Sequence, residues 1–226
     1  MIKKPLQPGV IFDWDGVIVD SSRAHLRSWE ILAEERNLLL SENHFRLGFG
    51  KRNEEIIPRI LRWSHDPDEI RELSERKEEI FRKIISQEGL DPLPGVRRLL
   101  EDLKQRKIPC AVGSSTCRPN IELALEIMDL QANFSGIITE ECVSAGKPNP
   151  DVFLQAARVI DRDPNEIVVF EDSLAGIEAG IAGGFKVIAV ATTNPAELLR
   201  RTRAHYVIER LTEAGVGLID ALLRER

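Results

Sequence analysis

Short apolar runs rich in β-branched residues alternate with helical patterns along most of the chain, most clearly after residue 90. This rhythm is typical of βαβ units, in which helices cover both faces of a parallel sheet. Strands are predicted at Val10–Asp13, Pro109–Ser114, Gly136–Thr139, Ile167–Glu171, Lys186–Ala191 and His205–Ile208. Helices are predicted at Val96–Arg106, Asn120–Asp129, Pro150–Ile160, Ala175–Ala182, Ala196–Arg201 and Glu213–Arg224. The pattern therefore predicts an α/β fold with a doubly wound parallel sheet, a Rossmann-like core.

Residues 22–88 break this rhythm, because they hold three helical patterns and no convincing strand. The apolar positions of these patterns are Ala24, Trp29 and Leu32; Ile56, Ile60 and Leu61; and Ile70, Leu73, Ile80, Phe81 and Ile84. The third helix is expected to begin at Asp66-Pro67, an N-cap followed by proline, and to end at Gly89. We expect a helical cap at 22–88, inserted into an α/β core of residues 1–21 and 89–226. The two crossings lie close together, so this cap can pivot as a lid.

Composition and charge exclude several classes of protein. The chain has 226 residues, of which 42% are hydrophobic and 30% charged, as is usual for a folded globular protein. The 31 basic and 37 acidic residues give a net charge of −6, so no positive field attracts nucleic acid or anionic lipid. Cys110, Cys117 and Cys142 form no CxxC pair, which argues against a disulfide framework and against a thiolate zinc site.

The apolar runs are too short to cross a membrane. Val187–Ala191 is among the longest, whereas a membrane span needs roughly 20 residues. No apolar signal segment follows Met1. We therefore expect a cytoplasmic location, and a monomer or a weak homodimer.

Polar side chains follow four of the predicted strands. Asp13 and Asp15 follow the first strand, Ser114-Ser115-Thr116 the second and Lys147 the third, while Glu171-Asp172 ends the fourth. In an open parallel sheet, ligands bind beyond the carboxyl ends of the strands. The sequence therefore predicts one crevice that holds several carboxylates, a hydroxyl and an ammonium group.

These residue types favour phosphoryl transfer. Carboxylates at close quarters repel one another unless a cation joins them, and Mg²⁺ suits a site that is rich in Asp and poor in His and Cys. Together with Lys147, the cation would receive a phosphate. One Asp can then attack as a nucleophile and form an aspartyl-phosphate. The Asp two residues further on can protonate the leaving oxygen and later deprotonate water.

Four segments closely resemble, in order and spacing, the motifs of the haloacid-dehalogenase-like (HAD) superfamily. They are Phe12–Ser21, Val112–Ser115, Lys147–Asp151 and Phe170–Gly176. The likeness covers almost the whole chain, includes a helical cap after the first strand, and is greatest to the β-phosphoglucomutase-like phosphatase branch.

The resemblance implies a role for each matching residue. Asp13 would be the nucleophile and a Mg²⁺ ligand, and Asp15 the general acid/base whose backbone carbonyl also binds the metal. Asp172 would be a further metal ligand with Glu171 beside it. Ser114 and Lys147 would hold the phosphoryl oxygens.

Within the cap, the resemblance points to His25 and Lys77 as residues near the substrate. The arginine that grips the second phosphate in β-phosphoglucomutase has no clean counterpart, because Asn53 aligns with it and Arg52 is one residue away. We take Ser115, His25, Lys77 and Arg52 as candidate substrate-binding residues. Lys77 and Arg52 sit among charges and equally fit a solvated helix face.

The sequence thus predicts a Mg²⁺-dependent phosphatase that hydrolyses a small phosphorylated metabolite, a sugar phosphate, through an aspartyl-phosphate intermediate. The first alternative is a β-phosphoglucomutase-like phosphosugar mutase, although Asn53 disfavours the grip on a bisphosphate that a mutase needs. A remote alternative is a non-enzymatic phospho-receiver, which also uses an acidic pocket, a hydroxyl and a lysine. A receiver would need neither a helical cap nor a second acid two residues past the acceptor.

Overall fold

The computed structural model describes residues 7–41, 43–48 and 51–225. Within these residues the chain forms two compact units. The first unit comprises residues 1–20, 91–118 and 129–226, and the second comprises 21–90 and 119–128, apart from the residues outside the described ranges. The domain boundaries expected from the sequence, which place 119–128 in the core, stay a prediction.

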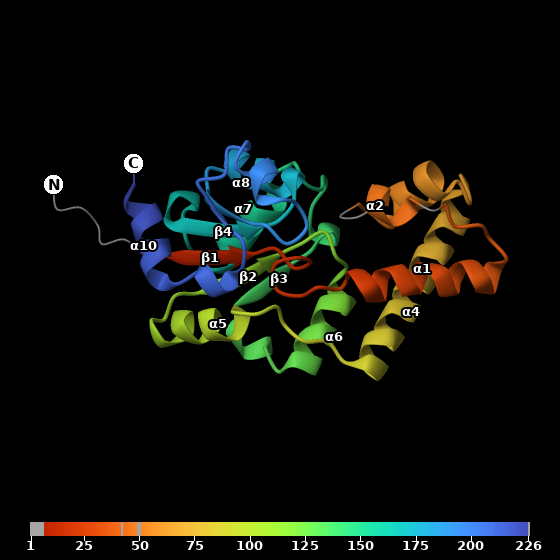
Figure 1. Ribbon diagram of the computed structural model, residues 1–226, viewed down its shortest axis with the longest axis horizontal. Coiled ribbons are helices and arrows are strands. Elements are labelled where there is room, and N and C mark those ends of the chain that lie inside the picture. The colour runs from red at the N-terminus through yellow and green to blue at the C-terminus, as the bar shows by residue number, and fades with distance from the viewer. Residues whose placement is uncertain (1–6, 42, 49–50, 226) are drawn as a thin grey trace. The chain divides into compact units, whose positions relative to one another are not determined.

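The first unit is built on a parallel sheet that has six strands in the described part of the chain (Figure 1). The strands are β1 (Gly9–Phe12), β2 (Cys110–Gly113), β3 (Gly136–Ile138), β4 (Ile167–Glu171), β5 (Lys186–Val190) and β6 (Tyr206–Ile208). Their order is β3-β2-β1-β4-β5-β6, with β1 between β2 and β4. This order confirms the predicted doubly wound α/β fold.

Helices cover both faces of this sheet, which is why its central strands are buried throughout. They are α5 (Val96–Gln105), α7 (Asp151–Val159), α8 (Leu174–Ala182), α9 (Ala196–Leu199) and α10 (Val216–Arg224). Figure 1 shows α7 and α8 on one face and α5 on the other. Short 3₁₀ helices join them at Gln131–Asn133, Glu140–Cys142, Pro164–Glu166 and Leu211–Glu213. Side chains alternate between the faces: Ile11 packs with Phe153, while Phe12 stacks on Phe170 with ring centroids 5.1 Å apart.

The strand boundaries differ from the predicted ones by one residue at several ends. Asp13 and Ser114, predicted as the last residues of their strands, lie just beyond β1 and β2. The predicted final helix was too long, because Leu211–Glu213 forms a separate 3₁₀ turn and Gly215 is extended before α10 begins. The polar residues of the first two strands therefore project from loops at the carboxyl edge.

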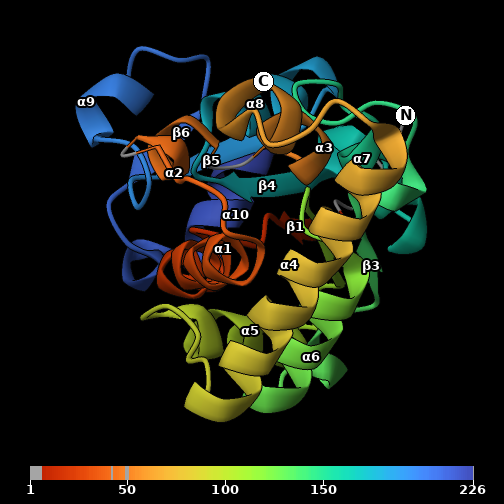
Figure 2. The same ribbon diagram turned by 90° about the vertical axis from the view of Figure 1, so that its right-hand side faces the viewer.

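The second unit is helical. It contains α1 (Ser22–Arg36), α2 (His44–Gly48), α3 (Asn53–Glu55), a π-helix (Ile56–Leu61), α4 (Pro67–Glu88) and most of α6 (Arg118–Met128). Figure 2 shows α1 and α6 beside the long α4. Trp29, Leu32, Ile57 and Leu73 belong to its apolar core. Asp66 caps α4 by accepting hydrogen bonds from the backbone of Asp68 and Glu69, which confirms the predicted helix start.

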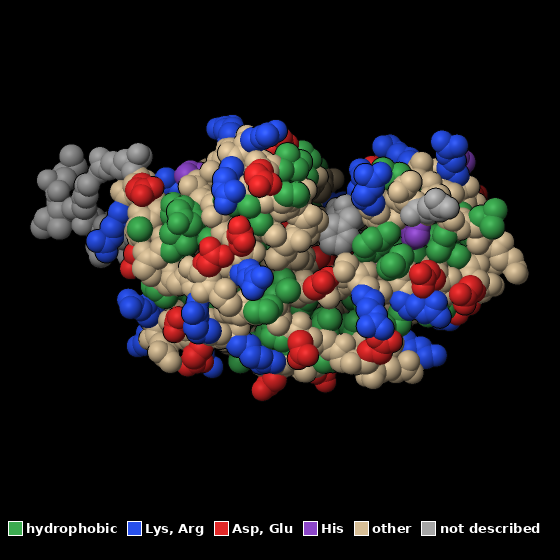
Figure 3. All heavy atoms as spheres, in the orientation of Figure 1, with side chains coloured by type: hydrophobic (Ala, Val, Ile, Leu, Met, Phe, Trp, Pro, Cys, Tyr) green, Lys and Arg blue, Asp and Glu red, His purple; other side chains and the backbone are tan. Residues whose placement is uncertain are grey.

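Basic and acidic side chains are interspersed on the face shown in Figure 3. Exposed ion pairs also occur among the described residues, such as Arg76 with Glu35 at 2.8 Å. Among the helices of the described residues, none has both the length and the apolar character needed to cross a membrane.

Candidate active site

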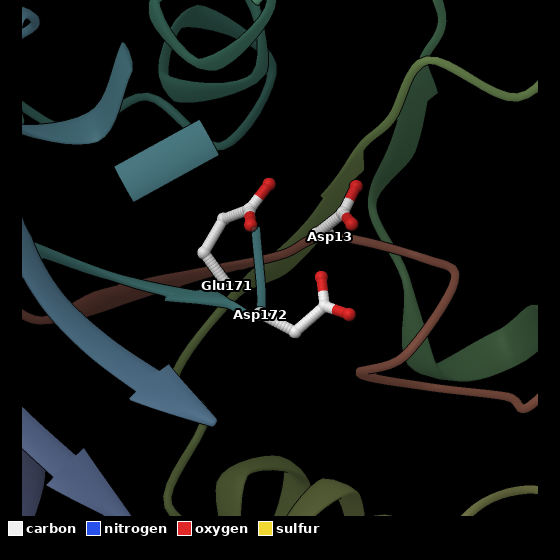
Figure 4. A group of neighbouring side chains, drawn as sticks. All are labelled: Asp13, Glu171 and Asp172. Carbon is white, nitrogen blue, oxygen red and sulfur yellow. The ribbon is translucent and has the colours of Figure 1, made fainter. Parts of the chain in front are cut away.

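Three carboxylates meet at the carboxyl edge of the sheet, beyond the central strands β1 and β4 (Figure 4). Asp13 follows β1, Glu171 ends β4 and Asp172 comes next. One oxygen from each group lies within 4.8 Å of the others, and all three residues are buried. The Asp13 amide donates to the Phe170 carbonyl at 3.0 Å, which ties the end of β1 to β4. The pairing of adjacent parallel strands thus brings together residues that are far apart in the sequence. We call Asp13, Glu171 and Asp172 the carboxylate cluster.

Lys147 supplies a positive charge to the carboxylate cluster. Its Nζ donates to Asp13 Oδ1 at 2.6 Å and to Glu171 Oε1 at 2.7 Å. The ammonium group also lies 4.7 Å from the centre of the Phe153 ring. Glu171 in turn accepts from the Ser173 amide at 2.6 Å through its other oxygen. The two hydrogen bonds therefore fix the ammonium group of Lys147 between Asp13 and Glu171.

The cluster contains more buried negative charge than Lys147 alone offsets. Burial raises the pKa of Asp13 to about 7, against the opposing effect of Lys147. Burial, together with Glu171 and Asp13, raises the pKa of Asp172 to about 9. Although burial disfavours the charged ammonium, Asp13 and Glu171 raise the pKa of Lys147 above its usual range. A divalent cation would relieve the remaining repulsion among the carboxylates.

The donor set fits Mg²⁺. The carboxylate cluster offers oxygen ligands alone, and hard divalent cations prefer carboxylate oxygens. Asp13, Asp172 and Glu171 are the side chains that could hold the ion. Glu171 also accepts a hydrogen bond from Lys147, so the same side chain would contact a bound cation and the ammonium group.

Asp15 and Ser114 are joined through Thr116. The Thr116 hydroxyl donates to Asp15 Oδ2, and the Thr116 amide donates to Ser114 Oγ at 3.0 Å. Ser114 is buried directly after β2, the neighbour of β1 in the sheet, whereas Ser115 and Asp15 are half-buried. The structure therefore brings the core candidates of the sequence to one sheet edge.

The sequence analysis placed Thr116 after the second strand but gave it no role, and it missed a segment after β5. In that segment, Thr193 donates its hydroxyl to Asp172 Oδ2, and Asn194 Nδ2 donates to the Asp172 carbonyl at 2.9 Å. Thr192 donates to the Gly16 carbonyl. The signal that could have found this segment is its place, since β5 is a fifth strand that ends at the same edge.

In the helical unit, His25 and Lys77 lie together in a polar cluster whose members are buried or half-buried. Lys77 Nζ is 2.6 Å from His25 Nδ1 and donates to Glu78 Oε1 at 2.8 Å. Asn53 Nδ2 donates to the same Glu78 oxygen at 2.7 Å, and Asn120 Nδ2 donates to Glu78 Oε2 at 2.6 Å. We call these five residues the helical polar cluster.

Lys77 is 2% exposed, so it does not belong to a solvated helix face. Its ammonium group lies 5.4 Å and 5.5 Å from the ring centres of Trp29 and Phe81. His25 stacks on Phe81 with 4.0 Å between ring centroids. Burial acts to raise the pKa of the Glu78 carboxyl group, but the charge of Lys77 helps to lower this pKa to about 2. Arg52 is half-buried at the start of α3, next to Asn53.

The family model described as haloacid dehalogenase-like hydrolase matches residues 10–190. The matched segment spans most of the chain and contains the whole carboxylate cluster. The chain therefore belongs to the haloacid dehalogenase-like hydrolase family and is an enzyme of that type.

Individual relatives support this assignment. The chain is 34% identical over 211 residues to the chloroplastic 5-amino-6-(5-phospho-D-ribitylamino)uracil phosphatase of Arabidopsis thaliana, covering 92% of this chain but 56% of that protein. The chain thus spans about half the length of that relative. It is 33% identical over 214 residues to the β-phosphoglucomutase of Bacillus subtilis (strain 168), covering 90% of this chain and 93% of that protein. The resemblance to the β-phosphoglucomutase-like branch is thereby confirmed.

A solved structure shares the fold. The family IA, variant 3 HAD hydrolase of Entamoeba histolytica HM-1:IMSS superposes with a TM-score of 0.87 at 26% identity. The superposition covers 96% of this chain and 100% of that one.

Proposed function

We propose that the chain is a Mg²⁺-dependent phosphatase that hydrolyses a small sugar or polyol phosphate. The observation that carries this proposal is the position of Asp13, which belongs to the carboxylate cluster and also accepts a hydrogen bond from Lys147. A carboxylate that faces both a cation site and an ammonium group suits attack on a phosphate, whose negative charge both groups offset. The names of the relatives support the substrate class, because they include a phosphatase of a ribityl phosphate and a phosphosugar mutase.

In the proposed mechanism, an Asp13 oxygen attacks phosphorus while the bond from phosphorus to the ester oxygen breaks. Asp15 donates a proton to that leaving oxygen, which yields the alcohol and phospho-Asp13. Asp15 then takes a proton from water as the water oxygen attacks phosphorus, which releases inorganic phosphate and restores Asp13.

The remaining residues bind and orient the phosphoryl group. Lys147 neutralises charge on the phosphoryl oxygens, and Ser114 donates a hydrogen bond to one of them. When bound, Mg²⁺ would add electrostatic stabilisation of the transferring group. We assign 1–21 and 89–226 to the catalytic core and 22–88 to the cap, with Ser115, His25, Lys77 and Arg52 as substrate-binding residues.

Phosphate release from a panel of phosphorylated metabolites tests the proposal. With Mg²⁺ present, the wild-type chain should release inorganic phosphate from at least one sugar or polyol phosphate, and Asp13→Asn should release none. Asp91→Asn is a matched control, because Asp91 is an exposed carboxylate of the first unit. Full turnover by the Asp13→Asn variant would overturn the mechanism.

A phosphosugar mutase is the second candidate, favoured by the similarity to the Bacillus subtilis enzyme over 93% of its length. A mutase must hold a bisphosphate by both ends. Asn53 carries no charge for a second phosphate, and its amide donates to Ser74 Oγ at 2.9 Å and to Glu78. Because both contacts engage the Asn53 amide, they favour the phosphatase over the mutase. Incubation with β-glucose 1-phosphate and a trace of the bisphosphate separates the two, since a mutase yields glucose 6-phosphate and a phosphatase yields inorganic phosphate.

A further inference from the structure

The segment Thr192–Asn194 follows β5 and contacts the carboxylate cluster and the turn after Asp15. Its three side chains donate hydrogen bonds to two residues that are distant in the sequence. Thr193 and Asn194 both reach Asp172, one at the carboxylate and the other at the backbone carbonyl. Thr192 reaches the carbonyl of Gly16. One short segment therefore fixes both the side chain and the backbone of a candidate metal ligand.

The space around Asp172 allows little movement on the side of Gly16. A Cβ atom added at Gly16 would lie 1.9 Å from Asp172 Oδ2 and 2.9 Å from Thr193 Oγ1. Gly16 also has a φ of 78°, a backbone conformation that favours glycine. The Asp172 carboxylate is thus confined between the backbone of the Asp15–Gly16 turn and the hydroxyl of Thr193.

The two partners of the Thr193–Asp172 hydrogen bond differ in burial. Asp172 is 2% exposed, whereas Thr193 lies on the exposed side of it. Removing the Thr193 hydroxyl would therefore leave the apolar core intact. It would remove the hydrogen bond that sets the rotation of a buried carboxylate. An effect of such a change on metal binding would then not reflect a weakened fold.

We propose that Thr193 and Asn194 are positioning residues that orient Asp172 for a divalent cation. The inference rests on the proposed function, which places Mg²⁺ at the carboxylate cluster. A ligand that is already oriented loses less rotational freedom when the ion binds. Removal of an outer hydrogen-bond partner of a metal ligand typically lowers metal affinity by about 10–100-fold.

Calorimetric titration of Mg²⁺ alone into the metal-stripped full chain tests the inference. Thr193→Val keeps the shape of the side chain and removes the hydroxyl, so its Kd for Mg²⁺ should rise at least about tenfold. Thr193→Ser keeps the hydroxyl and should bind within about threefold of wild type. Thr202→Val is the matched control, because Thr202 donates to the Leu199 carbonyl rather than to Asp172. This control should bind Mg²⁺ like the wild type.

Two further readouts separate positioning from a structural role. The melting temperature of metal-free Thr193→Val should stay within about 4 °C of that of the wild type, because one lost hydrogen bond costs about 1 kcal/mol. Its kcat should recover when Mg²⁺ is raised to saturation. Wild-type affinity in Thr193→Val, or an equal loss in Thr202→Val, would overturn the inference and leave the proposed function standing. A wild-type chain that binds no Mg²⁺ would overturn the proposed function and the inference with it.

Discussion

Gly176 and Gly217 both lie in the first turn of a helix, α8 and α10, but only Gly176 faces the carboxylate cluster. A Cβ atom at Gly176 would lie 1.7 Å from Glu171 Oε1, the oxygen that accepts from Lys147. We expect Gly176→Ala to displace the side chains of Glu171 and Lys147. A misplacement of about 1 Å can lower kcat/KM about 100-fold, and we expect a loss of that size. Phosphate release with Mg²⁺ measures this effect.

Gly217→Ala is the control for that substitution. No atom lies within 4 Å of a Cβ at Gly217, and alanine is the better helix former. This variant should keep wild-type activity and gain up to about 1 kcal/mol of stability. Equal activity of the two variants would contradict the assigned role of Glu171.

Glu78 gives a second prediction, because its charge is half-buried and is held by Lys77, Asn53 and Asn120. Glu78→Gln leaves the buried ammonium group of Lys77 without its carboxylate partner, which should lower the free energy of unfolding at pH 7 by about 3 kcal/mol. The control Glu75→Gln alters an exposed residue of the same helix and should change it by less than about 0.5 kcal/mol. Urea unfolding monitored by circular dichroism gives both values.

The effect of Glu78 should also depend on pH. The pKa of its carboxyl group is about 2 in the folded protein, below its ordinary value of 4.5. The carboxylate therefore contributes stability above pH 4.5, and the contribution is lost as the pH falls from 4.5 towards 2. The difference between wild type and Glu78→Gln should narrow over that window. A difference that stays constant from pH 7 to pH 3 would show that the charge of Glu78 does not stabilise the fold.

Sequence reasoning found the residues of the site that end strands and missed those that support them. Asp13, Lys147 and Asp172 were foreseen because the carboxyl ends of parallel strands meet at one edge. Thr193 and Glu78 were not, since their partners depend on loop paths and helix packing. A threonine after a strand, or a glutamate on a charged helix, has no pattern that reveals what it will contact.

The N-cap of α4 can be tested directly. Asp66 Oδ1 accepts from the amides of Asp68 at 2.9 Å and Glu69 at 3.0 Å. Asp66→Ala removes both bonds and should lower the free energy of unfolding by about 1 kcal/mol. Asp68→Ala is the comparison, because Asp68 forms an exposed ion pair with Arg71 that contributes about 0–1 kcal/mol. An Asp66→Ala chain as stable as wild type would show that the cap does not limit the stability of this helix.

The strands of the sheet were predicted well, whereas the short helices of the second unit were not. The strands of the buried sheet were placed to within about a residue because β-branched runs between turns leave little choice. The pattern of Ile56, Ile60 and Leu61 predicted a helix but not its π form. Pro58 has no N–H to donate, which disturbs α-helical hydrogen bonding there. The short α2 was missed because five residues show too little periodicity.

The net charge of the chain describes its surface and says little about the site. The chain is acidic, with a net charge of −6, and basic and acidic side chains are interspersed on the face shown in Figure 3. The charges that carry the proposed chemistry have buried side chains. Among them, Lys147 neutralises part of the negative charge of the carboxylate cluster. An acidic chain can therefore receive an anionic phosphate once a cation completes the site.

Metal removal tests this charge balance in the intact protein. Mg²⁺ that binds the folded chain alone should stabilise it by about 2.7 kcal/mol at 100 times its Kd. For a chain of this size, that corresponds to a rise in Tm of roughly 5–10 °C. Chelation by EDTA should reverse the rise. Asp172→Asn removes one carboxylate of the cluster, so it should lose most of the Mg²⁺-dependent rise, whereas the exposed Asp91→Asn should keep it. An equal Tm with Mg²⁺ and with EDTA would mean that the buried carboxylates are not balanced by this cation.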